Sequence, residues 1–471
     1  MAVRWAADEL GVAGVRVRLP DGAAADLHAL DLWQLLNLRP EDALDAAQAL
    51  ESLAPEPRRA AAALAMHSLE GLGFQDFGRR LEQDFGSPLP PAVVLVPSTA
   101  HYSWEKICRS LGIGAAQLVH VPVDRRFRMD AGALWETLAA LAARRQPVVG
   151  VVSVLGTTEE SAVDRLDLVA DARDRAAREL GMGFWLHADA AWGGYAVSIT
   201  RAEDGSRRAY GSALRDFAPE VWPDEGVYRA LSAVDRADSV TIDPHKLGFI
   251  PYPAGAIAVR DGRGRELLAV EAPYLFHGGH SPAYIGRYIF EGSKPGAAAA
   301  AVWMSHKVLP LDRSGYGRLI GETARGALVL HRRLAGGNWD PFRVVPLPTP
   351  DLNIVCFAVG HPALETLEAT NAFVDRVYRS MSVSDDRLAR QIDYFVTKTV
   401  LQAREYGDAP EEIVRGLGFT MADYRRAGGV AVIRCTVMDP FMATQRGKVD
   451  FVEGFVRALG QVFQEQLASR A

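Results

Sequence analysis

Residues 184–194, Phe-Trp-Leu-His-Ala-Asp-Ala-Ala-Trp-Gly-Gly, carry an apolar run that leads to the carboxylate of Asp189. Residues 239–248, Ser-Val-Thr-Ile-Asp-Pro-His-Lys-Leu-Gly, carry a second apolar run that leads to the amine of Lys246. A carboxylate and an amine are both costly to bury without partners. Their position at the ends of two apolar runs therefore indicates a ligand that pairs with both.

Short apolar runs of the same kind recur through the middle of the chain. They lie at 93–96, 118–121, 148–154, 184–186, 240–242 and 256–259, and helix-forming stretches at 131–143 and 166–180 separate several of them. Apolar strands that alternate with helices are typical of a parallel sheet covered on both faces. Ligands bind beyond the carboxyl ends of such strands, so we expect Asp189, Lys246 and residues 156–158 to converge there.

We expect the chain to divide into a helical N-terminal region (1–90), a large α/β domain (91–308) and a C-terminal α+β domain (309–471). Good helix formers dominate 41–52 and 56–72. The C-terminal pattern predicts helices at 315–334 and 366–381, and strands near 344, 354 and 430–434. The polar, irregular stretch 201–222 predicts a surface excursion.

Composition narrows the function classes. A net charge of −6 argues against a nucleic-acid or anionic-membrane surface. No stretch approaches the ~20 apolar residues that span a bilayer, and the N-terminus lacks the apolar core of a signal peptide. Cys108, Cys356 and Cys435 have no metal or redox spacing, which predicts free thiols in a reducing cytoplasm. The 11 histidines are dispersed, so we expect no metal site.

Pyridoxal phosphate offsets both burial costs. Its aldehyde takes up the amine of Lys246 as a Schiff base, and its protonated pyridine nitrogen pairs with Asp189. The positive ring then accepts electrons released at the α-carbon of a substrate. The two stretches together therefore predict pyridoxal-phosphate chemistry.

Several motifs follow one another in a recognisable order. They are 101–106 (His-Tyr-Ser-Trp-Glu-Lys), 156–160 (Gly-Thr-Thr-Glu-Glu), 187–191, 242–246, 251–252, 272–276, 291–296 and 434–438. In this order they resemble the group II pyridoxal-phosphate-dependent amino-acid decarboxylases, with the bacterial tyrosine decarboxylases closest in motif. The resemblance implies fold type I, which is aspartate-aminotransferase-like, with a mostly parallel seven-stranded sheet and a smaller C-terminal domain. It also implies α-decarboxylation of an L-amino acid, with a tyrosine-like aromatic substrate.

The resemblance assigns the central roles. Lys246 carries the cofactor and Asp189 pairs with its ring nitrogen. Ala191 lies against one face of the ring, and His101 stacks on the other, where an imidazole can also orient the substrate carboxylate or relay a proton. Tyr274 is expected to return a proton to the α-carbon, with His101 as the alternative donor.

Other residues keep two interpretations. Thr157 and Thr158 are candidates for the ring oxygen or phosphate of the cofactor, and equally for a plain turn after a strand. His245 is expected at the phosphate, or as the residue that orients the neighbouring lysine. Ser293 is a candidate for a phosphate, including that of a neighbouring subunit, or for a helix N-cap. Tyr252 is expected near the substrate ring or packed at a loop base, and 439–443 near the substrate pocket.

The family holds its cofactor phosphate with a glycine- and serine-rich turn that feeds a helix N-terminus, and no stretch of this chain matches that turn. Three explanations remain open: a second polypeptide supplies it, the sequence is truncated, or the chain is a silent partner subunit. We favour the first, in a homodimer or a hetero-oligomer, because the catalytic motifs are intact. The alternative activities on the same cofactor are aldehyde formation and another carbon–carbon lyase reaction.

Overall fold

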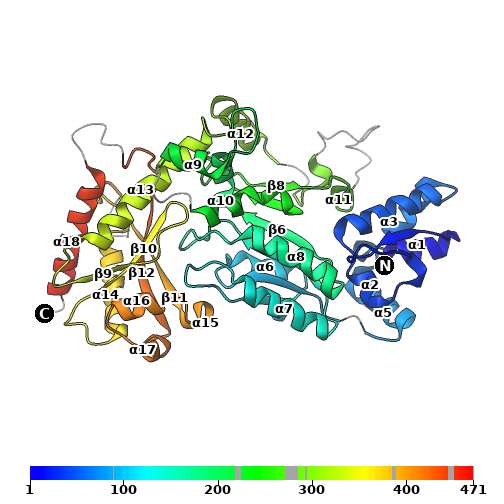
Figure 1. The fold of residues 1–471 in the computed structure, drawn as a ribbon, viewed down its shortest axis with the longest axis horizontal. Helices are drawn as coiled ribbons and strands as arrows, with labels where there is room; N and C mark the ends of the chain where they lie inside the picture. Colours follow the sequence, from blue (N-terminus) through cyan, green and yellow to red (C-terminus); the bar gives the residue numbers. More distant parts are fainter. Residues whose placement is uncertain are drawn as a thin grey trace.

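The computed structural model describes residues 1–88, 90–217, 224–270, 285–291, 294–383, 389–443 and 450–469. Three parts lie side by side along the long axis of the molecule (Figure 1). They are an N-terminal helical arm, a middle part built on the largest sheet, and a C-terminal part built on a second sheet. Tyr274 and Ser293 lie outside the described residues.

The largest sheet has the strand order β4-β3-β5-β6-β7-β8. Its strands are β3 (Val93–Pro97), β4 (Leu118–Val121), β5 (Val148–Val154), β6 (Trp185–Ala190), β7 (Ser239–Ile242) and β8 (Ala256–Val259). The pairs among β3 to β7 are parallel, whereas β8 pairs antiparallel with β7. The mostly parallel α/β fold is confirmed, but the described residues form six strands in place of the expected seven.

Helices cover one face of this sheet from β3 to β7. Side chains of α7 (Ala131–Ala143), α8 (Leu166–Leu180) and α10 (Glu225–Ser232) join the core formed by alternate residues of β3 and β5 to β7. The carboxylate of Asp130 caps α7 by accepting the N–H groups of Gly132 and Ala133. Both α7 and α8 span the residues that the sequence pattern predicted.

The opposite face is covered over only part of its width. There α6 (Ser103–Ser110) packs on β3, β4 and β5. Outside the area that α6 covers, Val149 at the start of β5 is 51% exposed and Ile257 on β8 is 68% exposed. All four residues of β8 are exposed. This uncovered region is called the open face below.

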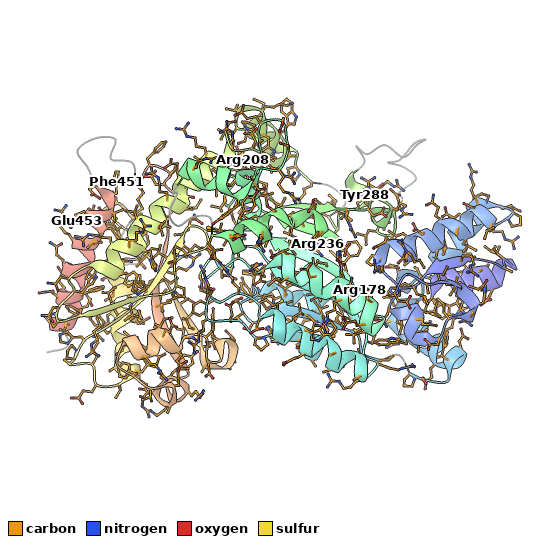
Figure 2. The ribbon with its side chains drawn as sticks, viewed as in Figure 1. Arg178, Arg208, Arg236, Tyr288, Phe451 and Glu453 are labelled. Carbon is orange, nitrogen blue, oxygen red and sulfur yellow. The ribbon has the colours of Figure 1, made fainter. Side chains whose placement is uncertain are left out.

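The remaining helices of the middle part lie around the sheet. They are α9 (Tyr210–Phe217), α11 (Arg263–Glu266) and α12 (Ala297–Val308), with the short 3-10 helices η2 (Ala115–Gln117), η3 (Gly193–Thr200), η4 (Val234–Arg236) and η5 (Ile285–Arg287). The stretch 201–222, predicted to be irregular, contains α9. Arg236 joins η4 to α8 through Asp171 and Asp174 (Figure 2).

The N-terminal arm has its own small core. Its elements are α1 (Ala2–Leu10), β1 (Arg16–Arg18), β2 (Ala24–Asp26), η1 (Leu27–Ala29), α2 (Leu32–Leu36), α3 (Pro40–Leu53), α4 (Pro57–His67) and α5 (Leu69–Phe85). The antiparallel pair β1–β2 departs from the expected all-helical region. The helix expected across 56–72 is interrupted at Ser68, whose hydroxyl accepts the N–H of Gly71 and so begins α5.

The C-terminal part is an antiparallel sheet, in the order β11-β12-β10-β9, packed with helices. It comprises α13 (Tyr316–Gly336), β9 (Arg343–Pro346), β10 (Ile354–Gly360), α14 (Leu367–Ser380), η6 (Ala389–Gln391), β11 (Thr397–Gln402), α15 (Ala403–Tyr406), α16 (Glu411–Gly416), α17 (Met421–Arg426), β12 (Gly429–Thr436) and α18 (Phe451–Ala468). Arg333 of α13 forms an ion pair with Glu453 of α18, and Glu453 is labelled in Figure 2. The first half of α13 packs on the core of the large sheet, and its second half packs on the C-terminal core.

A buried ion pair joins the middle and C-terminal parts. The Nε of Arg128 donates to Oδ2 of Asp351 over 2.7 Å, and the two residues are 5% and 4% exposed. The backbone N–H of Val163 donates to the same Asp351 oxygen over 2.9 Å. Removing one partner of such a pair leaves an uncompensated buried charge.

We therefore predict that Asp351→Ala lowers the free energy of unfolding by about 3 kcal/mol, because Arg128 stays buried without its main partner. Urea unfolding of the purified chain measures the change. The control is Glu179→Ala, which removes an exposed pair with Arg175 and should cost less than about 0.5 kcal/mol. Equal effects of the two changes would contradict the prediction.

Candidate active site

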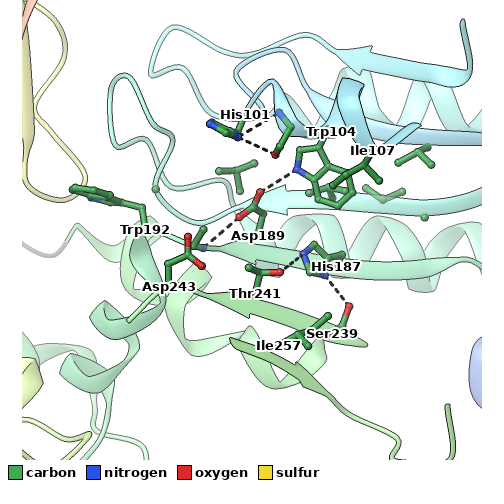
Figure 3. A pocket seen from close by; sticks show the side chains of 18 of the residues that line it. His101, Trp104, Ile107, His187, Asp189, Trp192, Ser239, Thr241, Asp243 and Ile257 are labelled. Carbon is green, nitrogen blue, oxygen red and sulfur yellow. Dashed lines mark hydrogen bonds between the residues drawn. The ribbon is translucent and has the colours of Figure 1, made fainter. Parts of the chain in front are cut away.

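A cavity of about 590 Å³ opens at the carboxyl ends of β5, β6 and β7 and continues along the open face of the sheet (Figure 3). Five of the predicted site residues line it: His101, Thr158, Asp189, Ala191 and Lys246. The convergence expected from the strand pattern is therefore present in the structure. The cavity follows from the topology, because these residues come from loops at the same edge of neighbouring parallel strands.

Asp189 is held at the end of β6. Its neighbours Ala188 and Ala190 point into the covered core, so the alternation of a strand directs Asp189 to the cavity side. The indole Nε1 of Trp104 donates to Oδ2 of Asp189 over 3.0 Å, and the backbone N–H of Ala191 donates to Oδ1 over 3.3 Å. Figure 3 shows the Trp104 and Asp189 side chains directed at each other. The carboxylate is thus oriented by two donors.

Lys246 lies in the turn that follows β7. Its Nζ is 3.0 Å from Oδ2 of Asp243, and its side chain is partly exposed to the cavity. The backbone after the lysine is anchored from α13, since the buried hydroxyl of Tyr316 donates to the carbonyl oxygen of Gly248 over 2.8 Å. A Cβ at position 248 would lie 2.5 Å from the carbonyl oxygen of Pro244, so this tight turn requires glycine. The loop that carries the lysine is therefore anchored to α13.

His101 follows β3 and faces the same cavity. Its Nδ1 accepts the backbone N–H of Ser103 over 3.3 Å and lies 2.9 Å from the hydroxyl of that residue. This places the proton of the neutral ring on Nε2, which is left for a ligand. Burial lowers the pKa of His101 below its ordinary 6.5, and the charge of Lys246 lowers it further, while Asp189 opposes the shift.

The other predicted residues are placed differently. Thr157 is 1% exposed, and its hydroxyl donates to Oε2 of Glu160 over 2.9 Å, so it faces away from the cavity. His245 is exposed, and its Nδ1 lies 2.5 Å from the carbonyl oxygen of Ala254. Tyr252, 52% exposed, is not among the residues that line the cavity, and neither is any residue of 439–443.

Trp104, Asp243 and His187 line the cavity and were not singled out from the sequence. All three lie inside the motifs quoted above, so proximity to His101, Lys246 and Asp189 was the available signal. His187 lies two residues before Asp189 on β6, so the two side chains are on the same face of the sheet. Its ring nitrogens lie 2.8 Å from the hydroxyl of Ser239 and 3.1 Å from that of Thr241. Burial lowers the pKa of His187, which favours the neutral ring.

The donor set fits the ring end of pyridoxal phosphate. One cavity presents an amine for the aldehyde, a carboxylate for the ring nitrogen and an imidazole for a ring face, from Lys246, Asp189 and His101. Beside Asp189 stands Ala191, whose small side chain leaves room for a flat ring. Among the described residues that line this cavity, Ser103, Thr158, Ser239 and Thr241 carry hydroxyl groups. A glycine-rich phosphate turn is not part of this lining.

Family models match two stretches of the chain. Residues 80–203 match the pyridoxal-dependent decarboxylase conserved domain, and residues 336–467 match the C-terminal domain of tyrosine decarboxylase. The L-tyrosine decarboxylase of Levilactobacillus brevis is 36% identical over 431 residues, which cover 89% of this chain. The chain is a homologue of the pyridoxal-dependent decarboxylases. The L-tyrosine decarboxylase of Enterococcus faecium is 34% identical over 429 residues, or 88% of this chain.

This decarboxylase homologue spans 65% of the length of the L. brevis relative and 66% of that of the E. faecium relative. Among solved structures, mouse CSAD matches with a TM-score of 0.58 and 20% identity, over 85% of this chain and 69% of that chain. Oryza sativa TDC, solved with PLP and tryptamine, matches with a TM-score of 0.55 and 20% identity, over 82% of this chain and 65% of that chain. These structures confirm the fold.

Within the described part of the decarboxylase homologue, no helix is both long and apolar enough to cross a membrane. The same residues contain no cluster of three or more histidine, cysteine, aspartate or glutamate side chains arranged to bind a metal. The three cysteines are unpaired and buried.

We predict that His101 is neutral at pH 7 in the cofactor-free chain, because burial and Lys246 both lower its pKa. Lys246→Met should raise this pKa by removing a positive charge, and Asp189→Asn should lower it by removing a negative one. NMR titration of the histidine ring resonances measures the change, with the His101 signal assigned from its loss in His101→Gln. A Lys246→Met chain with an unchanged His101 titration would contradict the geometry.

Proposed function

We propose that this protein is the larger part of a pyridoxal-phosphate-dependent decarboxylase that removes the α-carboxyl group of an L-amino acid. The main support is that Lys246, Asp189 and His101 open onto one cavity at the carboxyl edge of the sheet. The similarity to L-tyrosine decarboxylases over most of the chain supports the same reaction class.

Each cavity residue has a definite chemical task. Pyridoxal phosphate, when bound, supplies an electron sink for the pair released as carbon dioxide leaves the α-carbon. Asp189 holds a proton on the ring nitrogen, and its two donors, Trp104 and the N–H of Ala191, keep the carboxylate in place. Lys246 supplies the amine for the aldehyde, and Asp243 lies 3.0 Å from that amine and orients it.

The returning proton requires a donor at the α-carbon. His101 presents Nε2 to the cavity, because Nδ1 is occupied by Ser103. Tyr274 is the other proposed donor. A tyrosine hydroxyl and a neutral imidazole both deliver a proton near neutral pH when held within hydrogen-bond reach.

The proposed substrate is an aromatic, tyrosine-like amino acid. The names of the relatives support this choice. An assay of the assembled enzyme with L-tyrosine, L-phenylalanine, L-tryptophan and L-aspartate, measuring amine, aldehyde and carbon dioxide, tests it. Amine in equal amount to carbon dioxide supports decarboxylation, and aldehyde with ammonia supports the aldehyde-forming alternative.

We predict that Lys246→Ala lowers turnover by at least about three orders of magnitude, because the covalent attachment of the cofactor is lost. Borohydride reduction of the wild-type holoenzyme should add the mass of the reduced cofactor at Lys246, as measured by peptide mass spectrometry. The matched control is Lys398→Ala, which removes a lysine that pairs with Asp375 in the C-terminal part and should leave turnover unchanged. Near-normal turnover by Lys246→Ala would overturn the mechanism.

The open face supports a further part of this proposal, namely a second chain. A mostly parallel sheet normally has both faces covered. Here Val149 and Ile257 line the cavity and stay exposed, and the apolar edge strand β8 is exposed on both faces. Such edges and faces are sites of association.

We infer that a separate polypeptide packs on the open face and brings the phosphate-binding turn to the cavity. Its apolar side would cover Ile257 and Val149, and its backbone N–H groups would supply the phosphate donors that the described lining lacks.

Apolar side chains on α12 are exposed as well and support pairing with a second copy of this chain; they are Trp303, Met304 and Val308. The unpaired cysteines support a cytoplasmic location.

We predict that the chain purified alone binds pyridoxal phosphate weakly, and that the polypeptide encoded beside it restores stoichiometric binding and turnover. Ile257→Asp should abolish this restoration without changing the thermal midpoint of the chain alone, because the residue is exposed. The control is Leu53→Asp, an equally large apolar-to-acidic change at a residue 51% exposed on α3. Light scattering gives the mass of the complex, and full cofactor occupancy and turnover by the chain alone would rule out the second chain.

A further inference from the structure

One wall of the cavity is a turn that the C-terminal part holds from behind. The turn runs from 156 to 162, and it is closed by the N–H groups of Gly156 and Thr157, which both donate to the carbonyl oxygen of Ala162. Gly156 has φ +99°, and a Cβ there would lie 2.9 Å from Cδ1 of Leu352, so a side chain at this position is excluded. Gly156 and Thr158 face the cavity.

The other side of the turn is buried against the C-terminal part. Glu160 is buried, and it accepts a hydrogen bond at each carboxyl oxygen. The hydroxyl of Tyr406, the last residue of α15, donates to Oε1 over 2.6 Å. The hydroxyl of Thr157 donates to Oε2 over 2.9 Å, and itself accepts the N–H of Ala162 over 2.9 Å.

Hydrogen bonds from two C-terminal strands reinforce this attachment. The Nε of Arg434 on β12 donates to the carbonyl oxygen of Thr158 over 2.8 Å. The N–H of Ile354 on β10 donates to the hydroxyl of Ser161 over 3.2 Å. The side of the turn that faces the cavity is therefore placed by groups outside the large sheet.

We propose that Tyr406 and Glu160 are positioning residues for the proposed cofactor site, acting through Thr157 on the cavity wall formed by Gly156 and Thr158. The hydrogen-bonded chain Tyr406–Glu160–Thr157–Ala162 holds the turn closed and fixes where Thr158 meets a ligand. Tyr406 and Glu160 themselves do not line the cavity. This inference rests on the proposed function, because it assigns the turn to the binding of pyridoxal phosphate.

Burial explains why both hydroxyl donors to Glu160 matter. A buried carboxyl group without both donors is strongly unfavourable, so losing either hydroxyl destabilises this arrangement of the turn. Burial raises the pKa of Glu160 to about 7, while the Tyr406 and Thr157 hydroxyls act in the opposite direction. These donors stabilise the charged form, and the attachment therefore depends on both of them.

The experiment measures the affinity of the assembled wild-type and variant enzymes for pyridoxal phosphate, together with the absorption spectrum of the bound cofactor. Tyr406→Phe should weaken cofactor affinity by roughly fivefold to tenfold, since it removes one hydrogen bond to a buried carboxyl group. Thr157→Val should act in the same direction. Glu160→Gln keeps an acceptor for Tyr406 and should stay closer to the wild type than Glu160→Ala.

Tyr424 provides the matched control. It lies in the same buried cluster as Tyr406, and its hydroxyl has no hydrogen-bond partner in the described residues. Tyr424→Phe therefore removes a buried hydroxyl next to the same strands, without touching the turn. It should leave cofactor affinity and spectrum unchanged, which separates positioning of the site from a general effect on the C-terminal core.

The outcomes separate the two proposals. If the assembled wild-type enzyme binds no pyridoxal phosphate, the proposed function is wrong. If it binds the cofactor and Tyr406→Phe and Thr157→Val both retain its affinity and spectrum, the positioning role alone is overturned. Equal losses in Tyr406→Phe and Tyr424→Phe would also overturn it. Should Tyr406→Phe fail to fold, Thr157→Val and the comparison of Glu160→Gln with Glu160→Ala decide the question.

Discussion

The parallel pairing of β6 with β7 is the constraint on which the rest of the structure depends. It sets Asp189 opposite Thr241 and so brings the carboxylate at the end of one strand and the lysine loop after the other to the same edge. Two ionisable groups at the mouth of an apolar sheet need partners. Trp104 and Asp243 provide protein partners, and the cavity between these groups leaves space for a ligand that engages both.

The two faces of the large sheet are covered to different extents. On one face, α7, α8 and α10 complete a dry core that holds the strands in register. On the other, α6 covers only part of β3 to β5, and apolar residues such as Val149 and Ile257 remain exposed. The covered face holds the ends of the strands in fixed positions. The open face is a surface on which a second chain can associate. The cavity wall formed by residues 156–162 is positioned by the C-terminal part, which packs behind it.

The strands and helices of the large domain were predictable because their signals are local. Continuous apolar runs marked β3 to β8, and uninterrupted helix formers marked α7 and α8 to the residue. The misses have equally local causes. The hairpin β1–β2 has three residues per strand, which is too short to show an alternating pattern. Strand β11 mixes polar with apolar residues, and only Leu401 of its six residues is buried. Thr157 and Thr158 are neighbours of identical type, so no pattern distinguished the one that faces the cavity.

The sequence by itself determined which segments form the strands of the large sheet. It also determined that Asp189, His101 and Lys246 lie where strands end. Those properties depend on residue type and periodicity, which are local. Only the tertiary structure decided which groups meet: Trp104 with Asp189, Tyr406 with Glu160, and α6 with only part of one face. These contacts join residues far apart along the chain, and their geometry follows from how the strands and domains pack.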